Sequence, residues 1–161
     1  MLALLDPSRQ TIPEYVQYRA AIEQAASEVE GRHPGTLDLR ISDDFPQSVA
    51  GYKQFDVLLV NAVMDGLNLV AKEAPLVNTR DGIVVLSVNT GAFEELGEWV
   101  VPVDPLDLDG HVAALEQALA LTPGERRSRV DAIRAQVRSH DLEAWAEAQL
   151  AELDRVSTMR P

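Results

Sequence analysis

The sequence predicts an α/β domain built around a mainly parallel sheet. Apolar runs of strand length alternate with longer segments whose apolar residues recur every three or four positions. Two of these runs, within 56–63 and 81–89, are almost continuously aliphatic, which is typical of strands covered on both faces by helices. This alternation indicates parallel strands joined by helical crossovers, because each helix returns the chain to the same edge of the sheet.

The composition limits what the chain is expected to bind. Its 161 residues suffice for one domain with a substantial core, so we expect a single domain over 1–161. The formal net charge of −12 argues against nucleic acid or an anionic membrane as the main partner. The absence of cysteine excludes disulfides and thiol chemistry. No apolar run approaches the length of a membrane span, and we expect a cytoplasmic protein.

The chain begins with an expected strand and an amphipathic helix. Residues 1–5 form an apolar run that an Asp-Pro pair at 6–7 closes, as expected of a buried strand. A helix is expected over 12–33, since Pro13 suits the first turn of a helix. One face of this helix is apolar and comprises Tyr15, Tyr18, Ile22, Ala25, Ala26 and Val29.

A second strand, a short helix and a third strand follow. Residues 36–41 alternate apolar and polar side chains, as a strand with unequal faces does. A helix is expected over 42–55, with its N-cap among residues 42–44. The run at 56–63 is the strongest strand candidate, and a helix opens after it over 65–77.

The rest of the chain adds two strands and four helices. A buried strand is expected over 81–89, then a helix of one or two turns over 91–97. Pro102 confines the next strand to an edge or an end of the sheet. Three longer helices then cover 107–121, 123–140 and 141–156, with caps expected at Thr122 and Asp141; residues 156–161 are expected to fray.

Four loops leave the carboxyl ends of the expected strands, at 6–11, 42–44, 61–68 and 87–95. In an open parallel sheet such loops converge near one crevice, where ligands bind. The third loop is the richest in candidate ligand groups. The fourth loop has a similar arrangement, because Gly91 precedes a helix with Glu94 and Glu95 in its first turn.

The third loop combines a helix start with two acids. Gly66 lets a ligand approach the backbone, and the free N–H groups of Leu67, Asn68 and Leu69 would attract a phosphate. Carboxylates accept hydrogen bonds from hydroxyls. A phosphate between two such acids describes a nucleotide sugar, with one acid on the sugar and the other on the ribose. Those acids are Asp65 and Glu73.

Each feature also has a plain structural interpretation. From spacing alone, an ordinary turn with an N-cap at Asp65 and Gly66, and a solvated helix position for Glu73, is the commoner arrangement in α/β proteins. Lys72 is expected on the surface, and the basic segment 126–138 as a solvated helix face. Three histidines lack metal-ligand spacing and are expected to be structural or surface residues, namely His33, His111 and His140.

The segment 65–73, "DGLNLVAKE", closely resembles the signature of the trehalose-6-phosphate synthases, which are retaining glycosyltransferases of the GT-B fold. The neighbouring segments resemble the same family in the same order: "DPSRQTIPEYVQYR", "QFDVLLVNAVMDG", "VVLSVNTGAFEELG", "VDPLDLDGHVAALEQAL" and the closing helices. The resemblance covers nearly the whole chain. It implies the later part of a Rossmann-like, nucleotide-sugar-binding GT-B domain with a helical C-terminus.

The resemblance also implies roles for individual residues. Asp65 would bind sugar hydroxyls and Glu73 the ribose hydroxyls. The donor would be a UDP- or GDP-sugar, its glycosyl unit would pass to a sugar phosphate with retention, and neither metal nor other cofactor would be needed. Relatives that couple pseudo-sugars from a guanine nucleotide, such as validoxylamine-7′-phosphate synthase, remain open. The residues facing the sugar and diphosphate would be Gly66, Leu67, Asn68, Leu69 and Val70.

The chain departs from the family's pattern in three ways. The N-terminal acceptor domain has no counterpart here, and we expect the donor domain to be truncated at its N-terminal end. The opening strand of that domain, with the Arg and Lys that neutralise the diphosphate, is also missing, so much of the leaving-group stabilisation is lost. Met64 replaces a common Arg, and 41–46 reads "ISDDFP" near the place where the family has an aromatic beside the base.

Two hypotheses follow from these departures. In the first, the chain is part of an active synthase and needs the missing acceptor domain as its partner. In the second, it is a catalytically inactive, stand-alone binding or regulatory module of the same fold. Under both, missing strands would expose a sheet edge, so we expect a tendency to form homo-oligomers.

Overall fold

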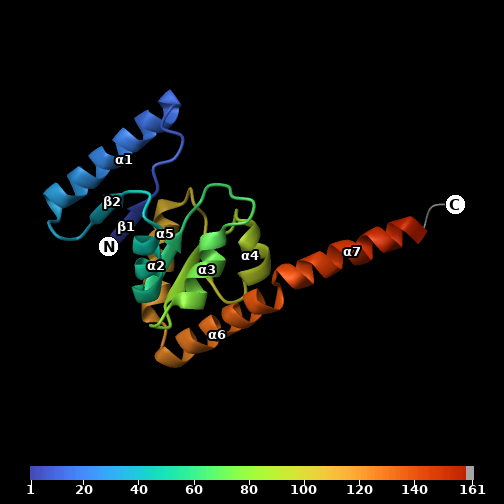
Figure 1. Ribbon diagram of the computed structural model, residues 1–161. Helices are drawn as coiled ribbons and strands as arrows, with labels where there is room; N and C mark the ends of the chain where they lie inside the picture. Colours follow the sequence, from blue (N-terminus) through green and yellow to red (C-terminus); the bar gives the residue numbers. More distant parts are fainter. Residues whose placement is uncertain (159–161) are drawn as a thin grey trace. The chain divides into compact units, whose positions relative to one another are not determined.

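The computed structural model describes residues 1–158, and these divide into two compact units (Figure 1). The first unit comprises residues 1–50 and the second begins at Gly51. The expected fraying of 156–161 falls partly outside the described residues, and the part inside them, 156–158, is helical.

The first unit holds a two-stranded parallel sheet and one long helix. Strand β1 (Leu2–Leu5) pairs with β2 (Asp38–Ile41) in parallel, with Leu2 opposite Asp38. Helix α1 (Pro13–Arg32) connects them and begins at Pro13, as the sequence predicts.

No residue of the first unit is buried. The expectation that the strand at 1–5 is buried is therefore wrong, and the apolar face of α1 contains no buried residue either. Tyr18 on that face is 69% exposed. The physical reason is that two strands and one helix offer too few layers to cover both faces of a sheet.

Helix α2 (Phe45–Gln54) begins in the first unit and ends in the second. Its N-terminus is capped by Asp44, whose carboxylate accepts a hydrogen bond of 2.9 Å from the backbone N–H of Gln47. This confirms the cap expected among residues 42–44.

The second unit is built on a three-stranded parallel sheet in the order β3 (Val57–Val60), β4 (Ile83–Ser87), β5 (Val101–Val103). All five residues of β4 are buried, as its aliphatic sequence predicts. Strand β5 lies at the edge, where Pro102 is exposed. The strands are thus all parallel but divided between two sheets, not joined in one as the sequence suggested.

Five helices follow the strands of this unit: α3 (Leu69–Val77), α4 (Gly91–Leu96), α5 (Leu108–Ala120), α6 (Pro123–Ser139) and α7 (Leu142–Thr158). Alternate residues of β4 belong to two different apolar clusters, because successive side chains of a strand point to opposite faces of the sheet. Val84 and Leu86 join residues of α3, α4 and α6, whereas Ile83 and Val85 join residues of α5 and α6. Both faces of β4 are therefore covered.

The arginines of α6 form the solvated face expected from the sequence only in part: Arg127 is exposed and pairs with the acid Asp81, whereas Arg126 and Arg134 are partly buried. Arg126 donates to the carbonyl oxygens of Ala118 and Leu121, and Arg134 to those of Pro75 and Asn78. The last carbonyl groups of a helix have no hydrogen-bond donor within that helix. The guanidinium groups of Arg126 and Arg134 are the donors to such carbonyls at the ends of α5 and α3. The basic segment is thus a structural connection inside the second unit.

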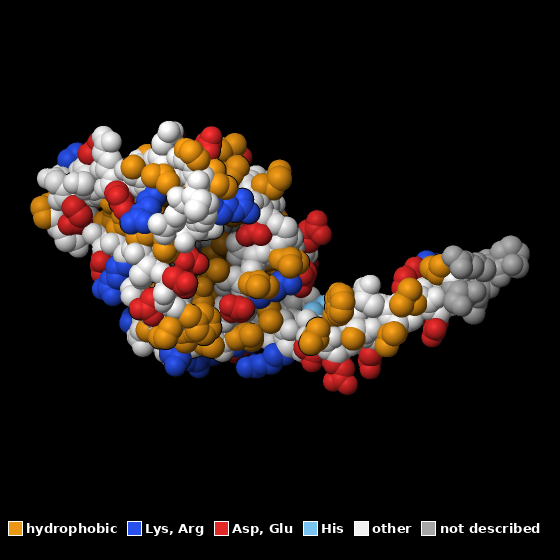
Figure 2. Space-filling model, turned by 45° about the horizontal axis from the view of Figure 1, so that its top comes forward, with side chains coloured by type: hydrophobic (Ala, Val, Ile, Leu, Met, Phe, Trp, Pro, Cys, Tyr) orange, Lys and Arg blue, Asp and Glu red, His pale blue; other side chains and the backbone are white. Residues whose placement is uncertain are grey.

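Helix α7 carries apolar side chains that stay exposed, as Figure 2 shows along its length. Asp141 caps it by accepting a hydrogen bond from the backbone N–H of Ala144, as predicted. In the described part of the chain, no helix has both the length and the apolar character needed to cross a membrane. The cytoplasmic location stays a prediction, and so does homo-oligomer formation.

Candidate functional site

The loops at 61–68 and 87–91 meet at the carboxyl ends of β3 and β4. A parallel bridge joins Asp65 to Thr90, and the N–H of Asp65 donates to the carbonyl of Asn89 at 3.2 Å. In return, the N–H groups of Gly91 and Ala92 donate to the carbonyls of Asp65 and Leu67, both at 3.0 Å. The two richest loops of the sequence are therefore brought together as expected.

The other two loops, at 6–11 and 42–44, belong to the first unit. The convergence of all four loops on one crevice stays a prediction, as does the organisation of 1–161 as a single domain.

The Asp65 carboxylate is engaged within its own loop. One oxygen accepts hydrogen bonds from the backbone N–H groups of Leu67 and Asn68, both at 3.2 Å. The other accepts from the side-chain amide of Asn68 at 3.0 Å. The expectation that the N–H groups of Leu67 and Asn68 are free is therefore wrong, because aspartate readily bonds to the backbone two and three residues ahead.

Helix α3 begins at Leu69, so the helix start lies four residues later than the sequence suggested. Its N-cap is Asn68, whose side-chain oxygen accepts a hydrogen bond of 3.0 Å from the N–H of Ala71. Asn68 has φ of 60°, in the left-handed region that asparagine tolerates better than most residues. This cap was not predicted, although asparagine is one of the residues preferred at the N-cap of a helix.

The outer surface of the site is open backbone and exposed side chain. Gly66, Leu67 and Leu69 are exposed, and a Cβ built at Gly66 would meet no atom within 4 Å. Val70 instead packs on the core cluster beside β4. Gly66, Leu67 and Leu69 are therefore open to a ligand from solvent, whereas Asn68 is buried and Val70 is partly buried.

Glu73 lies on the exposed side of α3, one turn past the helix start. The Glu73 carboxylate interacts electrostatically with the phenol of Tyr52 on α2. The pKa of Tyr52 is raised above its ordinary value. Burial of the phenol is the main cause, and the negative charge of the Glu73 carboxylate is the second. Tyr52 is thus a neighbour of the candidate site that no sequence motif indicated.

Lys72, expected on the surface, is partly exposed and forms an ion pair. Its ammonium lies 2.5 Å from a carboxylate oxygen of Glu95 on α4, and the Lys72 side chain is 21% exposed. The ion pair connects the helix that carries Glu73 to the helix that packs on the Asp65 loop.

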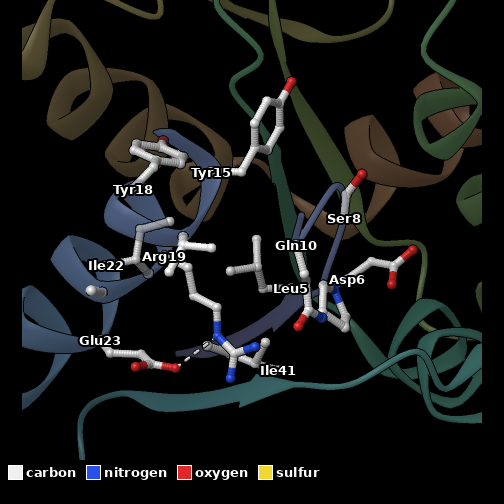
Figure 3. A pocket seen from close by; sticks show the side chains of 13 residues that line it. Leu5, Asp6, Ser8, Gln10, Tyr15, Tyr18, Arg19, Ile22, Glu23 and Ile41 are labelled. Atoms are coloured by element: carbon white, nitrogen blue, oxygen red, sulfur yellow. Dashed lines mark hydrogen bonds and ion pairs between the residues drawn. The ribbon is translucent and has the colours of Figure 1, made fainter. Parts of the chain in front are cut away.

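The described residues contain a pocket of about 380 Å³ in the first unit, between α1 and the two strands (Figure 3). Leu5, Ile22 and Ile41 line it, and the apolar face of α1 forms one wall. On its rim, Arg19 donates to Glu23 at 2.9 Å. None of the predicted site residues lines this pocket.

In the part of the chain that the structure describes, no three His, Asp or Glu side chains lie close enough together to hold a metal ion. His33, His111 and His140 lie in different segments, at the ends of α1 and α6 and within α5. Whether the protein uses a metal stays a prediction.

The parallel α/β architecture, with a loop–helix joint at the carboxyl ends of its strands, is that of a GT-B glycosyltransferase domain. The UDP-forming α,α-trehalose-phosphate synthase from Burkholderia xenovorans superposes with a TM-score of 0.87 at 29% identity, over 97% of this chain and 36% of that one. The chain belongs to glycosyltransferase family 20, whose family model matches residues 1–155. This confirms the resemblance inferred from 65–73 and its flanking segments.

Curated relatives of the chain include two kinds of enzyme. A validamine 7-phosphate valienyltransferase of Streptomyces hygroscopicus subsp. jinggangensis is 36% identical over 151 residues, 93% of this chain and 30% of that protein. A trehalose-6-phosphate synthase of Mycolicibacterium gilvum is 36% identical over 159 residues, 95% of this chain and 31% of that protein. The chain therefore spans about a third of the length of these relatives.

Proposed function

We propose that this chain is the nucleotide-sugar-binding part of a trehalose-6-phosphate-synthase-like retaining glycosyltransferase. The observation that carries the proposal is the joint at 65–73, where exposed backbone lies between two carboxylates on a chain of glycosyltransferase family 20. The donor is a UDP- or GDP-sugar, and the acceptor of the complete enzyme is a sugar phosphate. Neither a metal nor another cofactor is required.

The donor's hydroxyl groups divide between the two acids. Asp65 accepts from the sugar and Glu73 from the ribose. An ionised carboxylate has about four acceptor positions, and the loop uses three of those on Asp65. When sugar hydroxyls compete for this carboxylate, the N–H groups of Leu67 and Asn68 become donors for the diphosphate. Binding then exchanges hydrogen bonds within the loop for hydrogen bonds to the donor.

The departing diphosphate needs more positive charge than this joint supplies. Lys72 is the one basic residue in α3, and its charge is already paired with Glu95. Transition-state stabilisation of a developing anion depends on donors and cations held in place beforehand. Basic groups from another part of a longer enzyme, together with its acceptor-binding domain, therefore complete the site.

Calorimetric titration of the chain with UDP-glucose, GDP-glucose, UDP and GDP tests binding. Asp65→Ala and Glu73→Ala should each weaken binding of the nucleotide sugar by roughly tenfold or more, since each removes hydrogen bonds to a charged group. Glu116→Ala is the matched control, because Glu116 is an exposed glutamate on α5. Absence of binding to all four compounds, or equal binding by the three variants, would refute the proposal.

The second candidate function is a binding or regulatory module without catalysis. The pairing of Lys72 with Glu95 favours it, since that cation is not free to face a diphosphate. Purified chain mixed with UDP-glucose or GDP-glucose and glucose 6-phosphate should yield no disaccharide phosphate under either hypothesis. Adding the remaining part of a longer family member distinguishes the two, because only a catalytic half should regain transfer.

A further inference from the structure

The Asp65 loop is fixed from outside by the first turn of α4. Two backbone hydrogen bonds, from Gly91 and Ala92, end on carbonyls of the loop. The approach is so close that a Cβ at Gly91 would lie 2.0 Å from the carbonyl oxygen of Gly66. Since that oxygen belongs to the backbone, any side chain at position 91 would push the loop away.

The far end of α4 is fixed to α3 by the ion pair between Lys72 and Glu95. Both side chains are shielded on much of their surface, with 21% and 35% exposed. An ion pair in such a place is less screened by solvent than a fully exposed one, and its geometry is more firmly held. Lys72 is the sequence neighbour of Glu73, so the pair acts directly on the turn of α3 that carries the second acid.

We propose that Lys72 and Glu95 are positioning residues that fix the spacing between Asp65 and Glu73. Helix α4 then works as a brace, bonded at its start to the Asp65 loop and at its end to α3. This inference rests on the proposed function, in which one acid binds the sugar and the other the ribose. Neither Lys72 nor Glu95 touches the donor; they hold the two acids at the separation that one donor molecule spans.

If the ion pair is broken, the affinity for a ligand that contacts both acids should fall more than the affinity for a ligand that contacts only one of them. UDP-glucose engages both acids, whereas UDP lacks the sugar and engages only the ribose side. The measured quantity is the ratio of the Kd of UDP to the Kd of UDP-glucose, with GDP and GDP-glucose as the second pair. A general loss of stability lowers both affinities together and leaves the ratio unchanged.

Lys72→Met and Glu95→Gln should each lower this ratio by about threefold or more, as expected for coupled neighbours. The reversed pair, Lys72→Glu with Glu95→Lys, should restore most of it. Arg80→Met is the matched control, because it breaks another ion pair of the second unit, to Asp56, while leaving the brace intact. An unchanged ratio in both single variants of a chain that binds UDP-glucose would overturn the inference.

Amide hydrogen exchange supplies a readout that needs no ligand. In Lys72→Met, the N–H groups of Gly91 and Ala92 should exchange faster than in the unmodified chain, and in Arg80→Met they should not. If no nucleotide sugar binds but these amides respond as expected, the proposed function fails and the brace stands as structure alone. Unchanged exchange in Lys72→Met would show that the pair does not hold the loop.

Discussion

The two units of this chain use the same kinds of element and bury them to opposite degrees. In the first, β1, β2 and α1 contain no buried residue; in the second, every residue of β4 is buried. Both sheets are parallel and both units contain amphipathic helices. Periodicity therefore determines which elements form, whereas burial requires helices on both faces of a sheet.

Stability should follow burial. A unit without buried residues has few interactions to lose when it opens, so local opening there should cost less free energy than in the second unit. We therefore expect the amides of β1 and β2 to exchange by local opening, and those of β4 only by global unfolding.

The largest effect is expected in the core of the second unit. Leu86→Ala removes a fully buried side chain and should lower the free energy of unfolding by about 2–5 kcal/mol. Ile22→Ala, in the half-buried wall of the first unit's pocket, should cost less than about 1 kcal/mol. Denaturant unfolding followed by circular dichroism measures both. Equal losses would contradict the difference in burial between the two units.

An intermediate effect is expected at the start of α3. Asn68→Ala removes the cap on Ala71 and places alanine at φ of 60°, so it should cost about 1–2 kcal/mol. Asn68→Gly loses the same cap without the backbone strain and should cost less. Thermal unfolding of the two variants separates these contributions. A glycine variant less stable than the alanine variant would rule out the left-handed conformation as a source of strain.

The smallest effect is expected at the N-terminus of α6, where Thr122 and Glu125 form a capping box. Hydrogen bonds from the hydroxyl and the backbone N–H of Thr122 lower the pKa of Glu125 below its ordinary value. A lowered pKa in the folded chain means that this stabilisation is complete above the ordinary glutamate pKa. It is lost as the pH falls through the lowered value.

Glu125→Gln should therefore lower the free energy of unfolding near neutral pH. In acid, the free energies of unfolding of the variant and the unmodified chain should become equal. The free energy of unfolding of both proteins, measured across this range, tests the direction. A difference that grew as the pH fell would contradict the assignment of the cap.

Much of the fold could be predicted from the sequence, because its signals are local. The start of α1 at Pro13, the cap of α6 at Thr122 and the edge position of β5 all depend on one or two neighbouring residues. The partners of Arg126 and Arg134 could not be predicted in this way. They are carbonyls of α5 and α3, which only the packing of three helices brings near α6.

The meeting of the two candidate loops was predicted from the sequence, whereas the binding roles of their residues stay predictions. Spacing indicated that the loops around Asp65 and Gly91 lie at one edge of the sheet, and they bond to each other there. Spacing could not tell that the Asp65 carboxylate is used by its own loop, because one acid serves equally well as a cap or as a ligand. The partner of Lys72 lies 23 residues away on α4, beyond any local pattern.

Titrating the isotope-labelled chain with UDP-glucose and GDP-glucose, and following its amide NMR shifts, would show where the nucleotide sugar binds. We expect the largest shifts at the amides of residues 66–69, 73 and 90–92, with little change at residues 2–41. Shifts confined to the pocket of the first unit, or none at saturating concentrations of either compound, would contradict the assignment of the donor site to this joint.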